Sequence, residues 1–398
     1  MGSVANKMVQ AASGNTGDSP FDNLIQAGPG QGRTLDISDI DNISIEDTWT
    51  VGNNSWYNPS CSAIDREKGL LFVISSVNHY YLTVWDISDP TDVTVLSTNS
   101  QYNSGFSNCS QITINTTTQR IYTAGTRRVQ SWEYSDAGVM TYKTTFNTVI
   151  YQDAASIAID TEDDRLYVVA RDSRDSTGRA RHYEFDISTP DTFTQIGSSS
   201  VNTFDNTDPM PNGASTGSEP PAQTRSFLDM ETKILYGSMD RNSKVTAIDV
   251  STNGASSNQN MTLRDTLTDT LYDHQAAAMD FDEKLYFTAG FYPATGSGSG
   301  GFISCVDVSD PDNLSTTDMV SVLAARGGTF KRYVLKIDPA RKLLFQTSRF
   351  NSHTIDGATK YRINIIDYSD PTDLTVTTFD TPSESTNGAK AGWVLELF

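Results

Sequence analysis

Residues 84–90 of the chain read VWDISDP, and near copies of this segment recur along the sequence. The closest copies are EFDISTP at 184–190, CVDVSDP at 305–311 and IIDYSDP at 365–371. Weaker copies are LDISDID at 35–41, WEYSDAG at 132–138 and AIDVSTN at 247–253, which brings the total to seven. The segment predicts a half-buried strand that stops and turns, because Asp and Ser side chains bind nearby backbone amides and proline cannot donate to a strand ladder.

Further strand patterns surround each copy of the motif. A second apolar run precedes six of the copies, as in LLFVISS at 70–76, and an apolar strand with a polar hairpin precedes that run, as in AIDREKG at 63–69. A fourth strand follows, as in DVTVLST at 92–98. Four antiparallel strands repeated every 45 to 70 residues, roughly, are typical of propeller blades, whose closed ring leaves no long edge exposed. The sequence therefore predicts an all-β, seven-bladed β-propeller of four-stranded antiparallel blades.

The two ends of the chain complement each other. The N-terminal region supplies the second, third and fourth strands of a blade, and AGWVLELF at 391–398 supplies the missing first strand. We therefore expect Trp393 to Phe398 to lie beside Leu24 to Ile37 and to close the ring. The predicted domains are an N-terminal anchoring tail at 1–20 and the propeller at 21–398.

The strand–Asp–Ile/Val–Ser–Asp–Pro repeats resemble the LVIVD-repeat family of β-propellers over roughly residues 21 to 398. The resemblance implies the fold and leaves the function open, because such propellers occur in varied surface and extracellular proteins. The copies at 132–138 and 247–253 lack the proline, so their turns should be looser.

The predicted loops are unequal on the two faces of the ring. The hairpins between first and second strands are short, whereas the connections after the second and fourth strands are long, so we expect binding on the face with the long loops. Tyr and Arg side chains combine contact area with hydrogen-bonding ends and suit such a surface. The predicted contact residues are Tyr80, Tyr81, Arg174, Arg179, Tyr292, Arg349 and His353.

The start of the chain, VANKMVQAASGNTGD, resembles the Ala/Gln/Gly/Asn-rich beginning of structural proteins in marine-type tailed bacteriophages. This resemblance implies a virion protein, such as a fibre, spike or decoration protein. The tail, with Val4, Met8 and Val9 as its apolar anchor, would dock on other virion proteins, and the loop face would meet a host ligand. The leading prediction is thus a virion structural protein that is not an enzyme, and the alternative localisation is extracellular or at the cell surface.

Two alternatives stay open: a prokaryotic cell-surface binding propeller, and a channel-centred metal-dependent hydrolase resembling a lactonase. The sequence contains no common nucleophile or nucleotide motif. Its histidines do not share a blade position, and its cysteines form no CxxC pair, so we expect no metal site and no cofactor. The formal charge of -20 opposes nucleic-acid binding, and no segment is long and apolar enough to predict a membrane span. We expect His79 and His353 in loops that follow second strands, His182 at the end of another such loop, and His274 at the start of a first strand.

Overall fold

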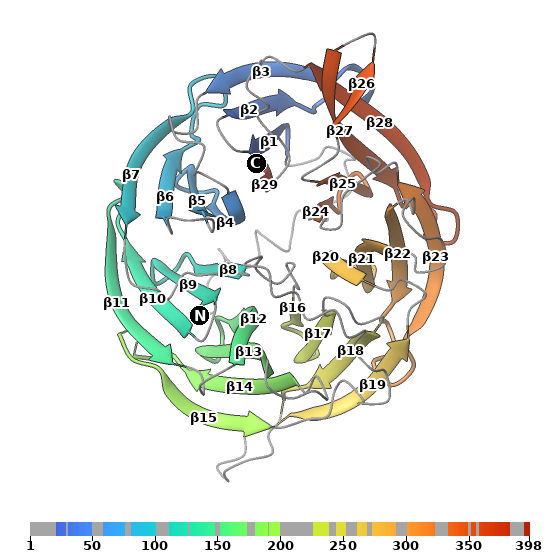
Figure 1. The fold of residues 1–398 in the computed structure, drawn as a ribbon. Coiled ribbons are helices and arrows are strands. Elements are labelled where there is room, and N and C mark those ends of the chain that lie inside the picture. The colour runs from blue at the N-terminus through green and yellow to red at the C-terminus, as the bar shows by residue number, and fades with distance from the viewer. Residues whose placement is uncertain are drawn as a thin grey trace.

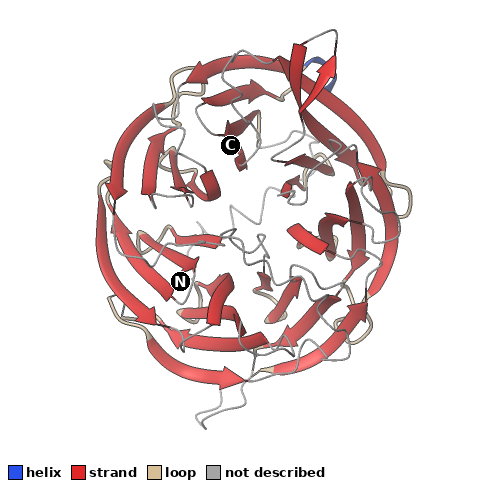
Figure 2. Ribbon diagram, in the orientation of Figure 1, coloured by secondary structure: helices blue, strands red, loops and turns tan. Residues whose placement is uncertain are grey.

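The chain forms a ring of β-sheets in a computed structural model (Figure 1). The residues that the structure describes are 21–28, 31–49, 59–75, 81–100, 111–125, 128–147, 152–172, 180–189, 191–199, 226–238, 244–251, 261–268, 273–291, 301–322, 333–348, 352–355, 358–382 and 394–398. Within these ranges strands dominate, and the helical content is one short 3-10 turn, Ile40–Asn42 (Figure 2). No helix in the described ranges is long and apolar enough to cross a membrane.

Seven antiparallel sheets make up the ring and confirm the predicted propeller. Each blade is numbered along the chain, and its strands run from the centre outward (Figure 1). Blades 1 to 3 contain β4 (Pro59–Asp65), β5 (Leu70–Ser75), β6 (Tyr81–Asp86) and β7 (Thr94–Ser100); β8 (Gln111–Asn115), β9 (Arg120–Gly125), β10 (Arg128–Tyr134) and β11 (Met140–Asn147); and β12 (Gln152–Asp160), β13 (Arg165–Asp172), β14 (Ala180–Asp186) and β15 (Thr194–Ser199).

Blades 4 to 6 continue the same order. They contain β16 (Ser226–Asp229), β17 (Ile234–Ser238), β18 (Lys244–Asp249) and β19 (Thr262–Thr268); β20 (Asp273–Asp280), β21 (Leu285–Phe291), β22 (Gly301–Asp307) and β23 (Ser315–Val322); and β24 (Tyr333–Asp338), β25 (Leu343–Ser348), β27 (Ala358–Asp367) and β28 (Thr375–Pro382). Blade 6 gains a fifth strand, β26 (Ser352–Ile355), which pairs with the start of β27. The sequence predicts a loop for this segment, and the structure shows a strand instead.

Blade 7 combines both ends of the chain, as predicted. Its inner strand is β29 (Val394–Leu397), followed outward by β1 (Asn23–Gly28), β2 (Gln31–Asp36) and β3 (Ser44–Trp49). Leu24 lies opposite Leu397, and Asn23 and Phe398 exchange backbone hydrogen bonds of 3.0 Å in both directions. The ring is therefore closed by strand pairing, although Trp393 itself falls outside the described residues.

The repeated motif ends the third strand of six blades in an Asp-based turn, and blade 2 has Glu133 at the equivalent position. In blade 1, the backbone amide and Oγ of Ser88 donate to Asp86 Oδ1 at 3.0 and 2.6 Å. Equivalent contacts bind Ser38 to Asp36 and Ser369 to Asp367, and further copies occur at Asp186, Asp249 and Asp307. The carboxylate thus replaces the next ladder partner, which is why the strand stops there.

The hairpin between first and second strands also repeats. Its last residue has a positive φ in six blades: Gly69, Gln119, Asp164, Lys233, Lys284 and Lys342. The carbonyl of this residue accepts the amide that follows the third strand, as in Ile87 N to Gly69 O at 2.8 Å and Val250 N to Lys233 O at 2.9 Å. The two kinds of turn are therefore bonded together on one face of blades 1, 3, 4, 5 and 6.

The core lies between blades. One apolar cluster joins Phe72 of blade 1 to Trp132 of blade 2, and another joins Tyr236 of blade 4 to Tyr286 of blade 5. All four of these side chains are at most 2% exposed. Each blade therefore completes its burial only against its neighbours, and the inner strands are held in fixed positions around the centre.

Candidate functional site

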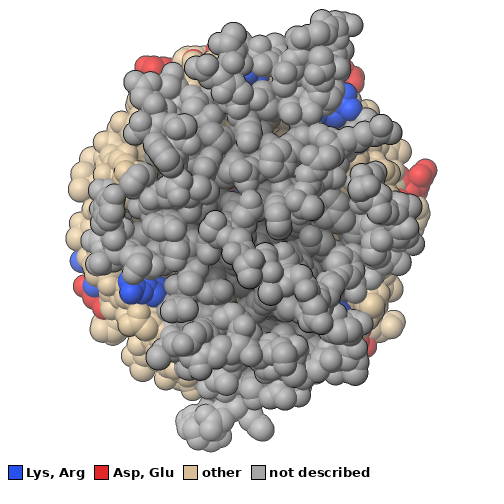
Figure 3. Space-filling model, viewed as in Figure 1, with Lys and Arg blue, Asp and Glu red and all other residues tan. Residues whose placement is uncertain are grey.

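The candidate site lies on the inner strands, which surround the centre of the ring (Figure 1). Most described side chains on these strands are apolar or small. Away from the strand ends, the charged ones among them are Lys336 on β24 and Glu396 on β29. In the view of Figure 3, the described charged side chains that can be seen lie away from the centre of the disc. A central charge pair is therefore a distinguishing feature of blades 6 and 7.

Strand alternation places a hydroxyl group beside this pair. Leu395 and Leu397 pack toward blade 6, so Glu396 between them turns toward blade 1. On β4, Cys61 and Ala63 pack toward blade 2, so Ser62 turns the other way, toward blade 7. The two side chains consequently meet across the boundary between blades 7 and 1.

Glu396 accepts two hydrogen bonds on the same carboxylate oxygen. Ser62 Oγ donates to Glu396 Oε1 at 2.6 Å, and Lys336 Nζ donates to the same atom at 2.7 Å. Glu396 is 3% exposed, whereas the Lys336 side chain retains 16% exposure. The cluster thus joins a hydroxyl, a carboxylate and an ammonium from the inner strands of blades 1, 7 and 6.

Arg66, in the turn after β4, holds the strand that carries Glu396. Its Nε and Nη2 donate to the carbonyl oxygen of Leu397 at 3.3 and 3.1 Å. Burial lowers the pKa of Arg66, and the charge of Glu396 opposes that shift. Arg66 therefore fixes the backbone next to Glu396 and adds positive potential near the carboxylate.

The arrangement has the groups that general acid–base chemistry requires. A carboxylate held by a hydroxyl and an ammonium can accept a proton in a fixed orientation, and the ammonium can stabilise a developing oxyanion. Within the described ranges, no group of three or more His, Cys, Asp or Glu side chains is placed to hold a metal ion. The described side chains therefore do not form the metal site that a metal-dependent hydrolase would need in the central channel.

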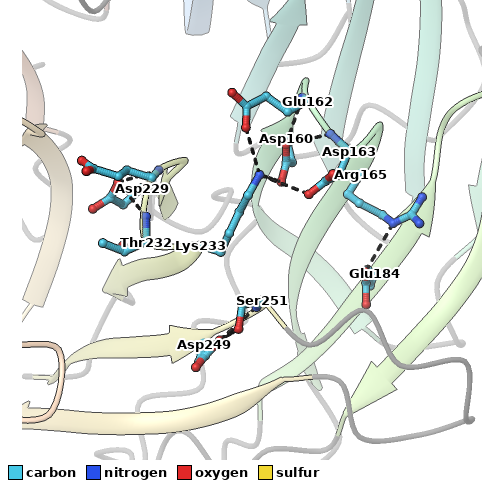
Figure 4. A network of polar contacts seen from close by, with 11 residues as sticks. Asp160, Glu162, Asp163, Arg165, Glu184, Asp229, Thr232, Lys233, Asp249 and Ser251 are labelled. Carbon is cyan, nitrogen blue, oxygen red and sulfur yellow. Dashed lines mark hydrogen bonds and ion pairs between the residues drawn. The ribbon is translucent and has the colours of Figure 1, made fainter.

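A second polar network ties neighbouring blades together through their turns (Figure 4). Lys233 of blade 4 donates to Asp160 Oδ2 of blade 3 at 2.7 Å, while Asp160 Oδ1 accepts turn amides of its own blade. Lys284 and Lys342 repeat this contact one and two blades further on. Because both oxygens of these buried carboxylates are engaged by the chain itself, the network is structural.

Most of the predicted contact residues fall outside the described residues. These are Tyr80, Arg174, Arg179, Tyr292 and Arg349, together with the tail residues Val4, Met8 and Val9. Tyr81 is described and is the half-buried first residue of β6 rather than a loop residue. His353 lies in β26, in the extra hairpin of blade 6.

The described histidines are separated from one another. His182 was expected at the end of a loop but lies inside β14 of blade 3, where it is 2% exposed and burial lowers its pKa to about 4. His274 lies near the start of β20 in blade 5, as expected, and is buried. His79 is outside the described residues. His182 and His274 sit on different strands of non-adjacent blades.

Sequence reasoning missed Ser62, Lys336 and Glu396. A signal was present, because LKID at 335–338 and VLEL at 394–397 each place a charge inside an apolar strand. A charged residue at such a position requires a partner when it is buried. What the strand pattern could not show is that three separate blades bring these residues together.

No family model and no curated protein matches the chain. Solved structures with the same fold include two described as putative 6-phosphogluconolactonases. The one from Bacteroides uniformis has 13% sequence identity and a TM-score of 0.62, and the match covers 96% of this chain and 100% of that chain. The one from Bacteroides fragilis has 14% identity and a TM-score of 0.62, with 97% and 100% of the two chains covered. A periplasmic gluconolactonase from Pseudomonas aeruginosa also matches, with 10% identity, a TM-score of 0.62, and 94% and 98% of the two chains covered.

These similarities show the fold. They also correct the expectation that the chain is not an enzyme, because the propellers that match nearly its whole length include proteins described as lactonases. Nothing in the comparisons points to a virion protein, and the resemblance to the LVIVD-repeat family stays a prediction.

Proposed function

We propose that the chain is a hydrolase of sugar lactones whose reaction centre lies on the inner strands. The observation that carries this proposal is the buried cluster in which Glu396 Oε1 accepts from both Ser62 Oγ and Lys336 Nζ. The lactonases among the proteins of the same fold support the choice of substrate class. The proposed activity is that of the lactonase-like hydrolase that the sequence left open as an alternative. It differs in that Glu396 and Lys336, rather than a metal ion, carry the reaction.

The reaction needs one base and one oxyanion donor. Glu396 takes a proton from water as the water oxygen attacks the lactone carbonyl carbon. The carbonyl electron pair moves to its oxygen, and the ammonium of Lys336 stabilises that oxyanion. Collapse of the intermediate breaks the ring C–O bond, and the departing ring oxygen receives the proton from Glu396. Lactone and water thus give an open-chain hydroxy acid, and Ser62 keeps the carboxylate oriented throughout.

The predicted binding partners and the predicted location do not involve the inner strands that carry the reaction centre. Docking through residues 1–20 on a larger assembly, and a virion or cell-surface location, stay predictions. A tail that docks is compatible with a propeller that hydrolyses a lactone at its centre.

Hydrolysis of gluconolactone, followed as acid release against the spontaneous rate, tests the proposal. Lys336→Met should lower kcat by about 100-fold, the usual effect of removing one oxyanion donor. Ser62→Ala should lower kcat by about tenfold, because Glu396 loses one of its orienting hydrogen bonds.

The matched control is Lys143→Met, which removes a lysine from an ion pair with Glu133 on the outer strands of blade 2. Its rate should equal that of the unmodified protein. Thermal unfolding of each variant reports whether the ring remains folded. Equal rates for a folded Lys336→Met variant and for the control would disprove the assignment.

A further inference from the structure

The turn after β4 differs from the equivalent turns of other blades because it carries an arginine. In this turn Arg66 directly follows Asp65, the last residue of β4. Met230 and Phe281 occupy the equivalent positions of blades 4 and 5, where they pack against apolar clusters. Blades 2, 3 and 6 also have uncharged residues at this position, namely Thr116, Thr161 and Pro339. The turn itself therefore does not require a cation.

Arg66 instead connects the two ends of the chain. Besides its two hydrogen bonds to the carbonyl oxygen of Leu397, its guanidinium carbon lies 4.7 Å from the centre of the Phe21 ring. The face of an aromatic ring attracts a cation placed over it. Phe21 precedes β1, and its own carbonyl oxygen accepts from Arg341 Nη2 at 2.8 Å. Phe21 and Leu397 thus hold the guanidinium together.

Arg66 acts on Glu396 together with Lys336. Lys336 of β24 binds the carboxylate directly, Ser62 of β4 donates its hydroxyl, and the apolar Ile25 lies opposite Glu396 on β1. Burial lowers the pKa of Arg66, and the charge of Glu396 counteracts that shift. Because the interaction of two charges is mutual, Arg66 also favours the ionised form of Glu396.

We propose that Arg66 is a positioning residue for the base of the reaction, and that Phe21 keeps it in place. Through the carbonyl oxygen of Leu397 it fixes the strand that carries Glu396. Through its charge it favours the carboxylate form that accepts the proton. The segment that enters the ring at Phe21 is thereby coupled to the reaction centre. This inference rests on the proposed lactone hydrolysis and adds to it a residue that does not touch the substrate.

The protonation of Glu396 measures the effect of Arg66 without any substrate. NMR of glutamate side chains labelled at the carboxyl carbon follows it as a function of pH, and Glu396→Gln assigns the signal by its loss. Arg66→Met introduces the residue type of blade 4 and should raise the midpoint by about 0.5–1 pH unit, because a positive charge near the carboxylate is removed. The matched control is Lys68→Met, since Lys68 lies in the same turn and pairs with Asp136 of blade 2. Its midpoint should equal that of the unmodified protein.

Two substitutions that differ in the aromatic ring test the part assigned to Phe21. Phe21→Leu keeps an apolar side chain but removes the ring beside Arg66, so it should raise the midpoint by about half as much as Arg66→Met. Phe21→Tyr keeps the ring and should behave like the unmodified protein. In gluconolactone hydrolysis, the acid limb of kcat/KM should move to higher pH by the same amount as the NMR midpoint of each variant.

The NMR and kinetic results separate the positioning role from the reaction. If the unmodified protein hydrolyses no lactone but the midpoint rises in Arg66→Met and not in Lys68→Met, the positioning role stands and the proposed reaction fails. An equal midpoint in a folded Arg66→Met variant and in the unmodified protein would overturn the role of Arg66, and an unchanged midpoint in Phe21→Leu would overturn that of Phe21. If Arg66→Met does not fold, Arg66→Gln gives the same test, because it removes the charge and keeps a donor for the Leu397 carbonyl oxygen.

Discussion

At the scale of single residues, the cost of burying charge explains why the central cluster holds together. Glu396 and the larger part of Lys336 are removed from water, which disfavours both charged forms unless they are paired. The 2.7 Å contact between them and the 2.6 Å bond from Ser62 supply that pairing. Because the cluster is largely shielded from water, the electrostatic effect of each charged group on a bound lactone is also stronger.

His182 makes stability depend on pH. Its folded-state pKa of about 4 lies below the ordinary value of 6.5, because burial disfavours the imidazolium. Between these two values the unfolded chain binds a proton that the folded chain does not, so stability falls as the pH falls. We expect the loss attributable to His182 to approach about 3 kcal/mol at pH 4.

Urea unfolding at several pH values between 7 and 4, roughly the window in which His182 titrates, measures this effect. His182→Leu should show a shallower pH dependence than the unmodified protein, and other titrating groups cancel in the comparison. Identical pH dependence in the two proteins would show that His182 does not titrate abnormally.

At the scale of elements, the hairpin after the first strand explains the shape of the turn face. Gly69 has a φ of 62°, and a Cβ at this position would lie 2.8 Å from the Cα of Ser88. Asp164 occupies the equivalent position of blade 3 with a φ of 51° and a side chain in place. Glycine is therefore required sterically in blade 1 and not in blade 3.

Substitutions at these two equivalent positions should have opposite effects. Gly69→Ala should destabilise the protein by about 1–3 kcal/mol, because the turn must move away from Ser88 and a positive φ disfavours alanine. Asp164→Gly should leave stability unchanged or raise it by about 1 kcal/mol at most. Chemical denaturation measures both, and a Gly69→Ala protein as stable as the unmodified one would contradict this account of the turn.

The strands could be predicted from sequence because their signals are local. Asp86 and Ser88 lie two residues apart, and their hydrogen bonds form within the motif itself. The hairpin of β26 in blade 6 carries no such motif, so its sequence predicts a loop. Ser62 and Glu396 are 334 residues apart, so their contact depends on ring closure and on the side toward which each strand turns them.

At the scale of the whole molecule, the acidic charge follows from the repeated turns. An aspartate ends the third strand in six blades, at 36, 86, 186, 249, 307 and 367, and the first strand in five, at 65, 160, 229, 280 and 338. These carboxylates accept backbone amides within their turns, so a substantial part of the charge has a structural use. The charge of -20 is thus no evidence for a cationic partner.

Arg341 of blade 6 strengthens the closure of the ring. Its Nη2 donates to Phe21 O at 2.8 Å, its Nη1 donates to Ile37 O, and its Nε binds the fully buried Asp338 at 2.6 Å. Arg341→Met removes these contacts and leaves the carboxylate of Asp338 without this ion pair. We expect a loss of about 3 kcal/mol in unfolding free energy.

Hydrogen exchange should locate this loss in β1, β2 and β29, the strands at the closure. Arg264→Met provides the control, because Arg264 pairs with Asp312 and Asp249 at an exposed position, and its removal should change stability little. Equal effects of the two substitutions would show that Arg341 has no special part in closure.

Glu396 is the residue on which the proposed reaction depends most directly, and it lies on the strand that closes the ring. The decisive measurement is the steady-state rate of gluconolactone hydrolysis by the unmodified protein and by Glu396→Gln, which keeps the size of the side chain and removes the base. We predict a rate well above the spontaneous one for the unmodified protein, and a kcat about 100-fold to 10,000-fold lower for the variant. Equal rates for the two folded proteins would contradict the assignment of Glu396 as the base.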